Sequence, residues 1–242
     1  RIEHKIPPES MNSLFDFLSQ TSNIALIILL TLIMAGSILA VEFSSGTIKL
    51  LAVTPYRRWK ILYGKYAAVM IISLGYLLLQ FICLILVGLV FFGTANMADP
   101  YLSVSGGQVV ESSYYLHVLS KYLMNCVSLV MIVIFAFMIS SLLRNNAVAI
   151  GLSLFIYFIG SGITQFMAGI LKWDWGKYLF FANTDLTQYF DLGVQRINTQ
   201  LYGQTTVFPG MSLAFSITVL VVYFIVFHAI AWLSFTKRDI TG

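Results

Sequence analysis

The sequence predicts an all-α membrane protein, a polytopic helical bundle in which five membrane spans are visible. Hydrophobic residues make up 59% of the 242 positions and charged residues only 10%, whereas soluble domains are about 25% charged. Five apolar runs are each long enough to cross about 30 Å of hydrocarbon. We therefore expect one transmembrane domain over residues 1–242.

The five apolar runs define the expected helices. The second run is longer than a span requires, so it must tilt or extend beyond the bilayer. Arg144-Asn145-Asn146 separates the third run from the fourth and predicts a tight helical hairpin. The expected transmembrane segments are 24–41, 66–92, 122–143, 147–171 and 211–235.

Residues 42–65 form a basic segment between the first two spans, and this segment sets the orientation. Lysine and arginine concentrate in cytoplasmic loops, so we expect a cytoplasmic loop here. With the Arg144 turn and the Lys237-Arg238 tail on the same side, that side holds more than half of the 14 Lys and Arg residues. The loop's charged residues are Glu42, Lys49, Arg57, Arg58, Lys60 and Lys65.

This orientation places residues 1–23 outside the cell. They contain no initiator methionine and no apolar signal segment. We therefore expect a missing upstream helix, with six spans in the full subunit. The alternative is a five-span protein with a short translocated N-terminus.

Two further external segments differ in character. Residues 93–120 are polar, contain Gly106-Gly107 and predict a mobile loop. Residues 172–210 mix aromatic and charged side chains, which is typical of the headgroup level. This loop is either an ordinary aromatic belt or a set of interfacial or re-entrant helices that cap the outer side.

The cytoplasmic loop has the features of a transmission element. Ser44-Ser45-Gly46 predicts the end of the preceding helix, residues 47–53 can form two short turns, and Thr54-Pro55 favours a new helix start. A short amphipathic helix in this loop would expose Ile48, Leu50 and Leu51 to a partner. The neighbouring cations and Trp59 would hold the loop at lipid headgroups.

The polar residues of the spans are few. None of the five predicted spans carries Asp, Glu, Lys or Arg away from its ends, which argues against an ion-coupled carrier. We interpret His228 as hydrogen-bonded between helices rather than as a proton relay, and Gly160-Ser161-Gly162 as a site of close packing or bending. We interpret Cys83 and Cys126 as small buried hydrophobes.

Known catalytic and binding patterns are absent from the sequence. There is no Gly-rich phosphate loop, no His-Glu-x-x-His pattern and no carboxylate pair within the spans. No basic stretch is interleaved with aromatics as nucleic-acid binders require. We therefore expect no enzyme activity, metal or nucleic acid for this chain.

Seven loop positions and the tail carry a resemblance to a known family. The loop positions are Glu42, Gly46, Thr47, Pro55, Arg58, Gly64 and Lys65, and the tail is Phe235-Thr-Lys-Arg-Asp-Ile240. The loop resembles the first cytoplasmic loop of the ABC-2 type permeases of bacterial ABC exporters, and the tail resembles their usual ending. Within the family, the chain looks similar to permeases of Gram-positive peptide export in a bacterial cell membrane, such as exporters of phenol-soluble modulins. The absence of the family's first helix is the main departure.

The resemblance implies a non-catalytic subunit of an ATP-driven exporter. ATP and Mg would bind a separate cytoplasmic ABC ATPase, and a second permease subunit, identical or different, would complete the complex. The neutral spans suit amphipathic or hydrophobic substrates such as cytolytic peptides, drugs or lipids. The expected ATPase contacts are Glu42, Gly46, Thr47, Ile48, Lys49, Leu50 and Leu51, and the expected headgroup anchors are Arg57, Arg58, Trp59, Lys60 and Lys65.

Other classes of function stay open at this point. A membrane sensor or scaffold could use the same basic loop to dock a signalling partner. A channel or a membrane-embedded enzyme is a further alternative, although no buried acid, base or metal constellation supports an enzyme.

Overall fold

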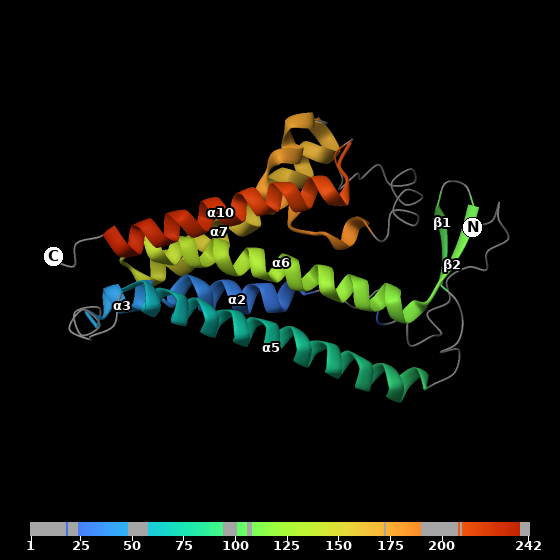
Figure 1. Ribbon diagram of the computed structural model, residues 1–242, viewed down its shortest axis with the longest axis horizontal. Helices are drawn as coiled ribbons and strands as arrows, with labels where there is room; N and C mark the ends of the chain where they lie inside the picture. Colours follow the sequence, from blue (N-terminus) through green and yellow to red (C-terminus); the bar gives the residue numbers. More distant parts are fainter. Residues whose placement is uncertain are drawn as a thin grey trace.

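The computed structural model describes residues 18, 24–47, 58–93, 101–105, 108–171, 173–189, 208 and 210–237. Nearly all of them are helical, and five helices are long and apolar enough to cross a membrane. The prediction of a multi-pass helical membrane protein is therefore confirmed. The spanning elements run along the long axis in Figure 1: α2 (Ala25–Ser37) with α3 (Ala40–Ser44), α5 (Arg58–Phe92), α6 (Tyr114–Leu142), α7 (Asn146–Phe166) and α10 (Leu213–Lys237).

Several helix ends differ from the prediction. Helix α5 begins at Arg58, inside the segment predicted as loop, and α6 begins at Tyr114 rather than at residue 122. At 1.5 Å per residue, the 35 residues of α5 and the 29 of α6 reach about 52 and 44 Å. Both exceed the roughly 30 Å of hydrocarbon, as expected for α5. Hydropathy marks only the part of a helix that lies in hydrocarbon, so the first turns of α5 and α6 were predicted as loop.

The earlier start of α6 also changes the expectation that the spans carry no charged residue away from their ends. Lys121 lies about two turns inside α6 and is only 6% exposed. The helix therefore carries a buried cation that the predicted span left out. One α6 face continues from Lys121 with the buried polar residues Asn125 and Ser128.

The connection between α5 and α6 contains strands, which the all-α prediction did not include. Strands β1 (Tyr101–Ser105) and β2 (Gln108–Ser112) pair antiparallel, with Tyr101 opposite Ser112 and Ser105 opposite Gln108. Figure 1 shows this hairpin at the far end of the two long helices. The segment predicted as a loop therefore contains a β-hairpin.

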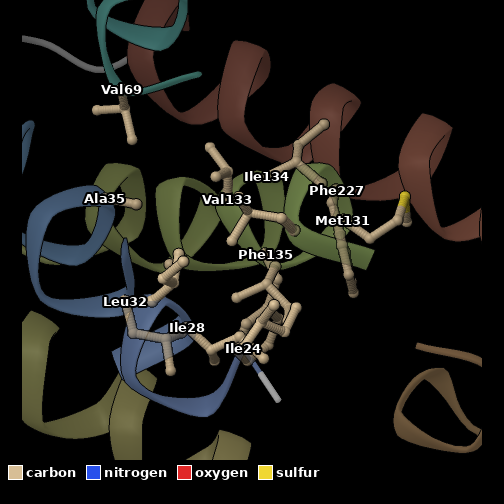
Figure 2. Close-up of a cluster of buried hydrophobic side chains, with 14 of the residues drawn as sticks. Ile24, Ile28, Leu32, Ala35, Val69, Met131, Val133, Ile134, Phe135 and Phe227 are labelled. Atoms are coloured by element: carbon tan, nitrogen blue, oxygen red, sulfur yellow. The ribbon is translucent and has the colours of Figure 1, made fainter. Parts of the chain in front are cut away.

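Helix α6 is the central helix of the bundle. It packs against α2, α5, α7 and α10, and 72% of its most apolar window is buried, against 11% for α5 and α10. The remaining apolar side chains of α5 and α10 therefore face outward, toward lipid or another protein. Figure 2 shows the main core, in which the labelled residues are Ile24, Ile28, Leu32, Ala35, Val69, Met131, Val133, Ile134, Phe135 and Phe227.

The segment after α7 turns back into the bundle. It consists of η1 (Met167–Leu171), η2 (Asp174–Tyr178), α8 (Phe180–Asn183) and η3 (Thr187–Tyr189). The ring of Phe180 lies 5.6 Å from that of Phe135 in α6 and 5.2 Å from that of Phe227 in α10. This packing places the described residues 173–189 against two of the long helices; residues 172, 190–207 and 209 of the predicted loop lie outside the described part of the chain.

Close packing and hydrogen bonds hold α8 against the bundle. A Cβ at Gly160 would overlap the Phe181 ring, so the glycine admits that ring, as the packing interpretation expected. Asn183 is fully buried, donates to the Leu179 carbonyl at 2.8 Å and accepts from Ser216 of α10 at 2.7 Å. Helix α8 is thus attached to α7 through Gly160 and to α10 through Ser216.

Candidate functional site at the basic end

The Glu42 clasp lies where the first span ends and the second begins. Glu42 Oε1 accepts a hydrogen bond from Lys65 Nζ at 2.6 Å, and the Thr47 hydroxyl donates to Oε2 of the same carboxylate. Lys65 Nζ also lies 3.4 Å from the carbonyl oxygen of Ile38. The two charged side chains are only 21% and 22% exposed, so water screens the pair weakly. We define the clasp as Glu42, Gly46, Thr47 and Lys65.

Gly46 provides the turn that closes the clasp. Its φ is +73°, a left-handed conformation that favours glycine. A Cβ there would have no heavy atom within 4 Å, so conformation rather than space selects the glycine. The Ser45 hydroxyl donates to the Val41 carbonyl at 2.7 Å and satisfies one end of α3. The predicted helix break at Ser44-Ser45-Gly46 is confirmed.

The backbone just before the clasp is bonded to α6 through Ser140. The Ser140 hydroxyl oxygen accepts hydrogen bonds from the backbone N–H groups of Leu39 at 3.0 Å and Ala40 at 3.1 Å. These groups lie at the break between α2 and α3, where a buried N–H without a partner is costly. Ser140 is itself fully buried. The break is therefore stabilised by tertiary contact with α6.

A small hydrophobic cluster joins the clasp to α10. Phe43 packs edge-on against Phe235, with 6.4 Å between ring centroids. On α10, Ser234 donates to the Ser141 carbonyl of α6 at 2.9 Å. The cluster contains residues of α5, α6 and α10 and the residue that precedes α3. Its buried members are Leu39, Leu62, Phe137, Ala231 and Phe235.

The structure brings together some of the predicted site residues and not others. Glu42 is bonded both to Thr47 and to Lys65, which was predicted as a headgroup anchor, and Gly46 makes the turn that precedes Thr47. The anchors Trp59 and Lys60 are exposed in the first turn of α5, where Lys60 Nζ lies 5.8 Å from the Trp59 ring. Arg58 is the first residue of α5, and its side chain lies outside the described part of the chain. The predicted contacts Ile48, Lys49, Leu50 and Leu51, and the anchor Arg57, lie outside the described residues.

Sequence reasoning did not single out two residues of this end, Ser140 and Tyr63. Ser140 carries no local signal, because a serine in an apolar helix is common and its partners are about 100 positions away. Tyr63 is the partner of His228, whose Nε2 lies 2.6 Å from the Tyr63 hydroxyl of α5. The interpretation of His228 as hydrogen-bonded between helices is confirmed.

The basic end combines an ion pair, a capped helix break and an aromatic contact. Within the described ranges, no group of three or more His, Cys, Asp or Glu residues could hold a metal ion.

Fold and site together define a multi-pass helical membrane protein whose first two spans are joined at a basic, clasped end. The chain belongs to the family described as "Protein of unknown function (DUF2705)", whose model matches residues 2–241. No solved structure matches the chain.

Two relatives from Bacillus subtilis (strain 168) are similar over most of the chain. The "Uncharacterized protein YhcI" is 39% identical over 245 residues, covering 100% of this chain and 74% of the relative. The "Uncharacterized membrane protein YdbK" is 32% identical over 225 residues, covering 93% of this chain and 82% of the relative. The second name agrees with the membrane assignment.

Proposed function

We propose that this chain is the membrane-spanning permease subunit of an ATP-driven exporter in a bacterial cell membrane. The observation that carries the proposal is the convergence of Glu42, Gly46, Thr47 and Lys65 in one clasp. These are motif positions of the family that the loop resembles. A sensor that only docks a partner does not require the two ends of its loop to be held together.

The clasp makes the loop a closed unit. Glu42 and Lys65 are its first and last residues, and their ion pair holds the loop ends together at 2.6 Å. A force on residues 48–51 therefore acts on α3 and α5 at once. Ser140 and Phe235 carry the same displacement to α6 and α10. An ATPase docked on the loop could thus move four helices together.

The energy source and the other partners follow from this role. ATP and Mg would bind the separate ATPase, and this chain would bind no cofactor. A second permease subunit would pack on the outward-facing apolar sides of the bundle, which are extensive on α5, α7 and α10. The substrates would be amphipathic or hydrophobic molecules, among them cytolytic peptides, drugs and lipids.

The test is recovery of the ATPase from native membranes. The full chain is purified in mild detergent, and co-purifying proteins are identified by mass spectrometry. We expect an ABC ATPase with the native chain and its loss with the double variant Ile48→Asp/Leu51→Asp, because two charges would enter an apolar contact without partners.

The matched control is the double variant Trp173→Asp/Trp175→Asp. It places two acids at exposed positions, 50% and 55% accessible, at the other end of the bundle. We expect this variant to retain the ATPase. Recovery of a signalling protein without any ATPase would contradict the proposal and favour the sensor or scaffold function.

A further inference from the structure

A ladder of four aromatic rings crosses from α5 to α10 near the basic end. Trp59 packs edge-on against Tyr63 at 6.1 Å, Tyr63 lies 5.3 Å from the His228 ring, and His228 stacks on Phe224 at 6.0 Å. Trp59, Tyr63 and Phe224 are 42%, 40% and 37% exposed. The ladder therefore lies on the outside of the bundle, where lipid is the surrounding medium.

The ladder has polar groups where a lipid-facing surface is normally apolar. The Tyr63 hydroxyl and His228 Nε2 are hydrogen-bonded at 2.6 Å, and this bond leaves Nδ1 of the ring available to another partner. Ionisable and histidine side chains within membrane helices usually mark a function rather than simple packing. A surface of this kind favours a ligand with hydrogen-bond acceptors.

A cation stands at the end of the ladder that lies in the first turn of α5. Lys60 is exposed there, its Nζ lies 5.8 Å from the Trp59 ring, and among the described residues no ion pair joins it to an acidic side chain. A cation at a helix N-terminus opposes the macrodipole, so a bound anion would relieve an unfavourable interaction. The charge of this patch is complementary to a phosphate.

The adjacent face of α5 has room for an acyl chain. A Cβ at Gly64 would have no heavy atom within 4 Å, and the exposed residues that follow on this face include Ala67 and Ala68. No bulky side chain of these three positions covers the surface beside Tyr63. An acyl chain lying here would run from Lys60 toward Phe224.

We propose that this surface binds one anionic phospholipid from the leaflet at the basic end. The lipid phosphate would contact Lys60, the Tyr63–His228 pair would hydrogen-bond near the glycerol ester region, and an acyl chain would lie along the small face of α5. We call this surface the lipid patch; its members are Trp59, Lys60, Tyr63, Gly64, Phe224 and His228. The proposal is independent of the exporter function.

Native mass spectrometry of the full chain in mild detergent tests the lipid patch. Phosphatidylglycerol and phosphatidylcholine with identical acyl chains are titrated separately. We expect one phosphatidylglycerol to be retained per chain, with markedly weaker retention of phosphatidylcholine. Equal retention of both lipids would overturn the proposal. Competition by inorganic phosphate at millimolar concentration would also overturn it, because the site would then be selective for the free ion.

Variants separate a defined site from general attraction to a charged surface. We expect Lys60→Gln to weaken phosphatidylglycerol binding roughly fivefold, the equivalent of about 1 kcal/mol per surface cation. His228→Phe keeps the ring and removes its hydrogen bonds, and we expect a similar loss. If only the cation variant weakens binding, the attraction is diffuse and the proposal is wrong.

The control for charge is Lys177→Gln. Lys177 also lies over an aromatic ring, 5.4 Å from Tyr178, but at the other end of the bundle. We expect it to bind phosphatidylglycerol as the native chain does, and an equal loss there would contradict the site. Tyr63→Phe is the second test of the hydrogen-bonded pair if His228→Phe lowers the yield of folded protein.

Discussion

Glu42 and Lys65 are 23 positions apart in the chain, and their side-chain charges lie 2.6 Å apart in space. The pair closes the loop between the first two spans and joins the end of α3 to the second turn of α5. Because most of its surface is withdrawn from water, its loss should affect both stability and the position of the loop.

Lys65→Met is expected to destabilise the protein by about 2 kcal/mol, because Glu42 would keep its charge without a cation in a partly buried site. Adding Glu42→Gln should recover part of this loss, giving a coupling of about 1 kcal/mol between the two positions. The measurement is unfolding in detergent of the native chain, both single variants and the double variant. Strictly additive effects would show that the ion pair does not contribute.

Ser140→Ala is expected to cost about 2 kcal/mol, because the backbone N–H groups of Leu39 and Ala40 would lose their buried acceptor. The comparison is Ser161→Ala, since the Ser161 hydroxyl bonds only to a carbonyl of its own helix, Phe158, at 3.0 Å. We expect a lower unfolding temperature for Ser140→Ala alone. Equal behaviour of the two variants would remove the role given to Ser140.

Gly160→Ala is expected to displace α8, because the added methyl group would overlap the Phe181 ring. Overpacking of this kind costs about 1–3 kcal/mol. Gly162→Ala is the matched control, since a Cβ there has no heavy atom within 4 Å. Thermal unfolding should separate the two variants, and Phe181→Leu should partly restore the stability of Gly160→Ala. An unchanged unfolding temperature for Gly160→Ala would contradict the packing of α8 against α7.

The orientation can be tested with cysteine labelling in intact cells. In a background with Cys83→Ala and Cys126→Ala, we expect Ser44→Cys to be protected from a membrane-impermeant maleimide and Trp175→Cys to react. Both positions are exposed in the structure, so a difference in labelling reports the side of the membrane. Reaction of Ser44→Cys alone would reverse the orientation inferred from the positive charges.

The helices that cross the bilayer were predictable because hydropathy is a local property of the chain. Their ends were less predictable, since a polar helical turn beyond the hydrocarbon has the same composition as a loop. This explains the missed starts of α5 at Arg58 and α6 at Tyr114. It also explains why Lys121 was placed outside a helix that contains it.

The candidate site was predictable in its members and not in its contacts. The motif pointed to Glu42, Gly46, Thr47 and Lys65, but their proximity depends on how two helices separated by a loop pack together. Ser140 had no signal at all, because its hydroxyl serves backbone groups about 100 positions earlier. The partner of His228 was hidden for the same reason.

Composition and local backbone preference alone determined that this chain is a helical membrane protein, where its five apolar segments lie and that the helix before the loop ends at Ser44-Ser45-Gly46. Those properties depend on transfer from water to lipid and on local backbone preference, which each short segment expresses independently. Tertiary structure decided that α6 is central, that α8 turns back into the bundle and that Glu42 meets Lys65. Such contacts join residues that are distant in the chain, and no single segment specifies them.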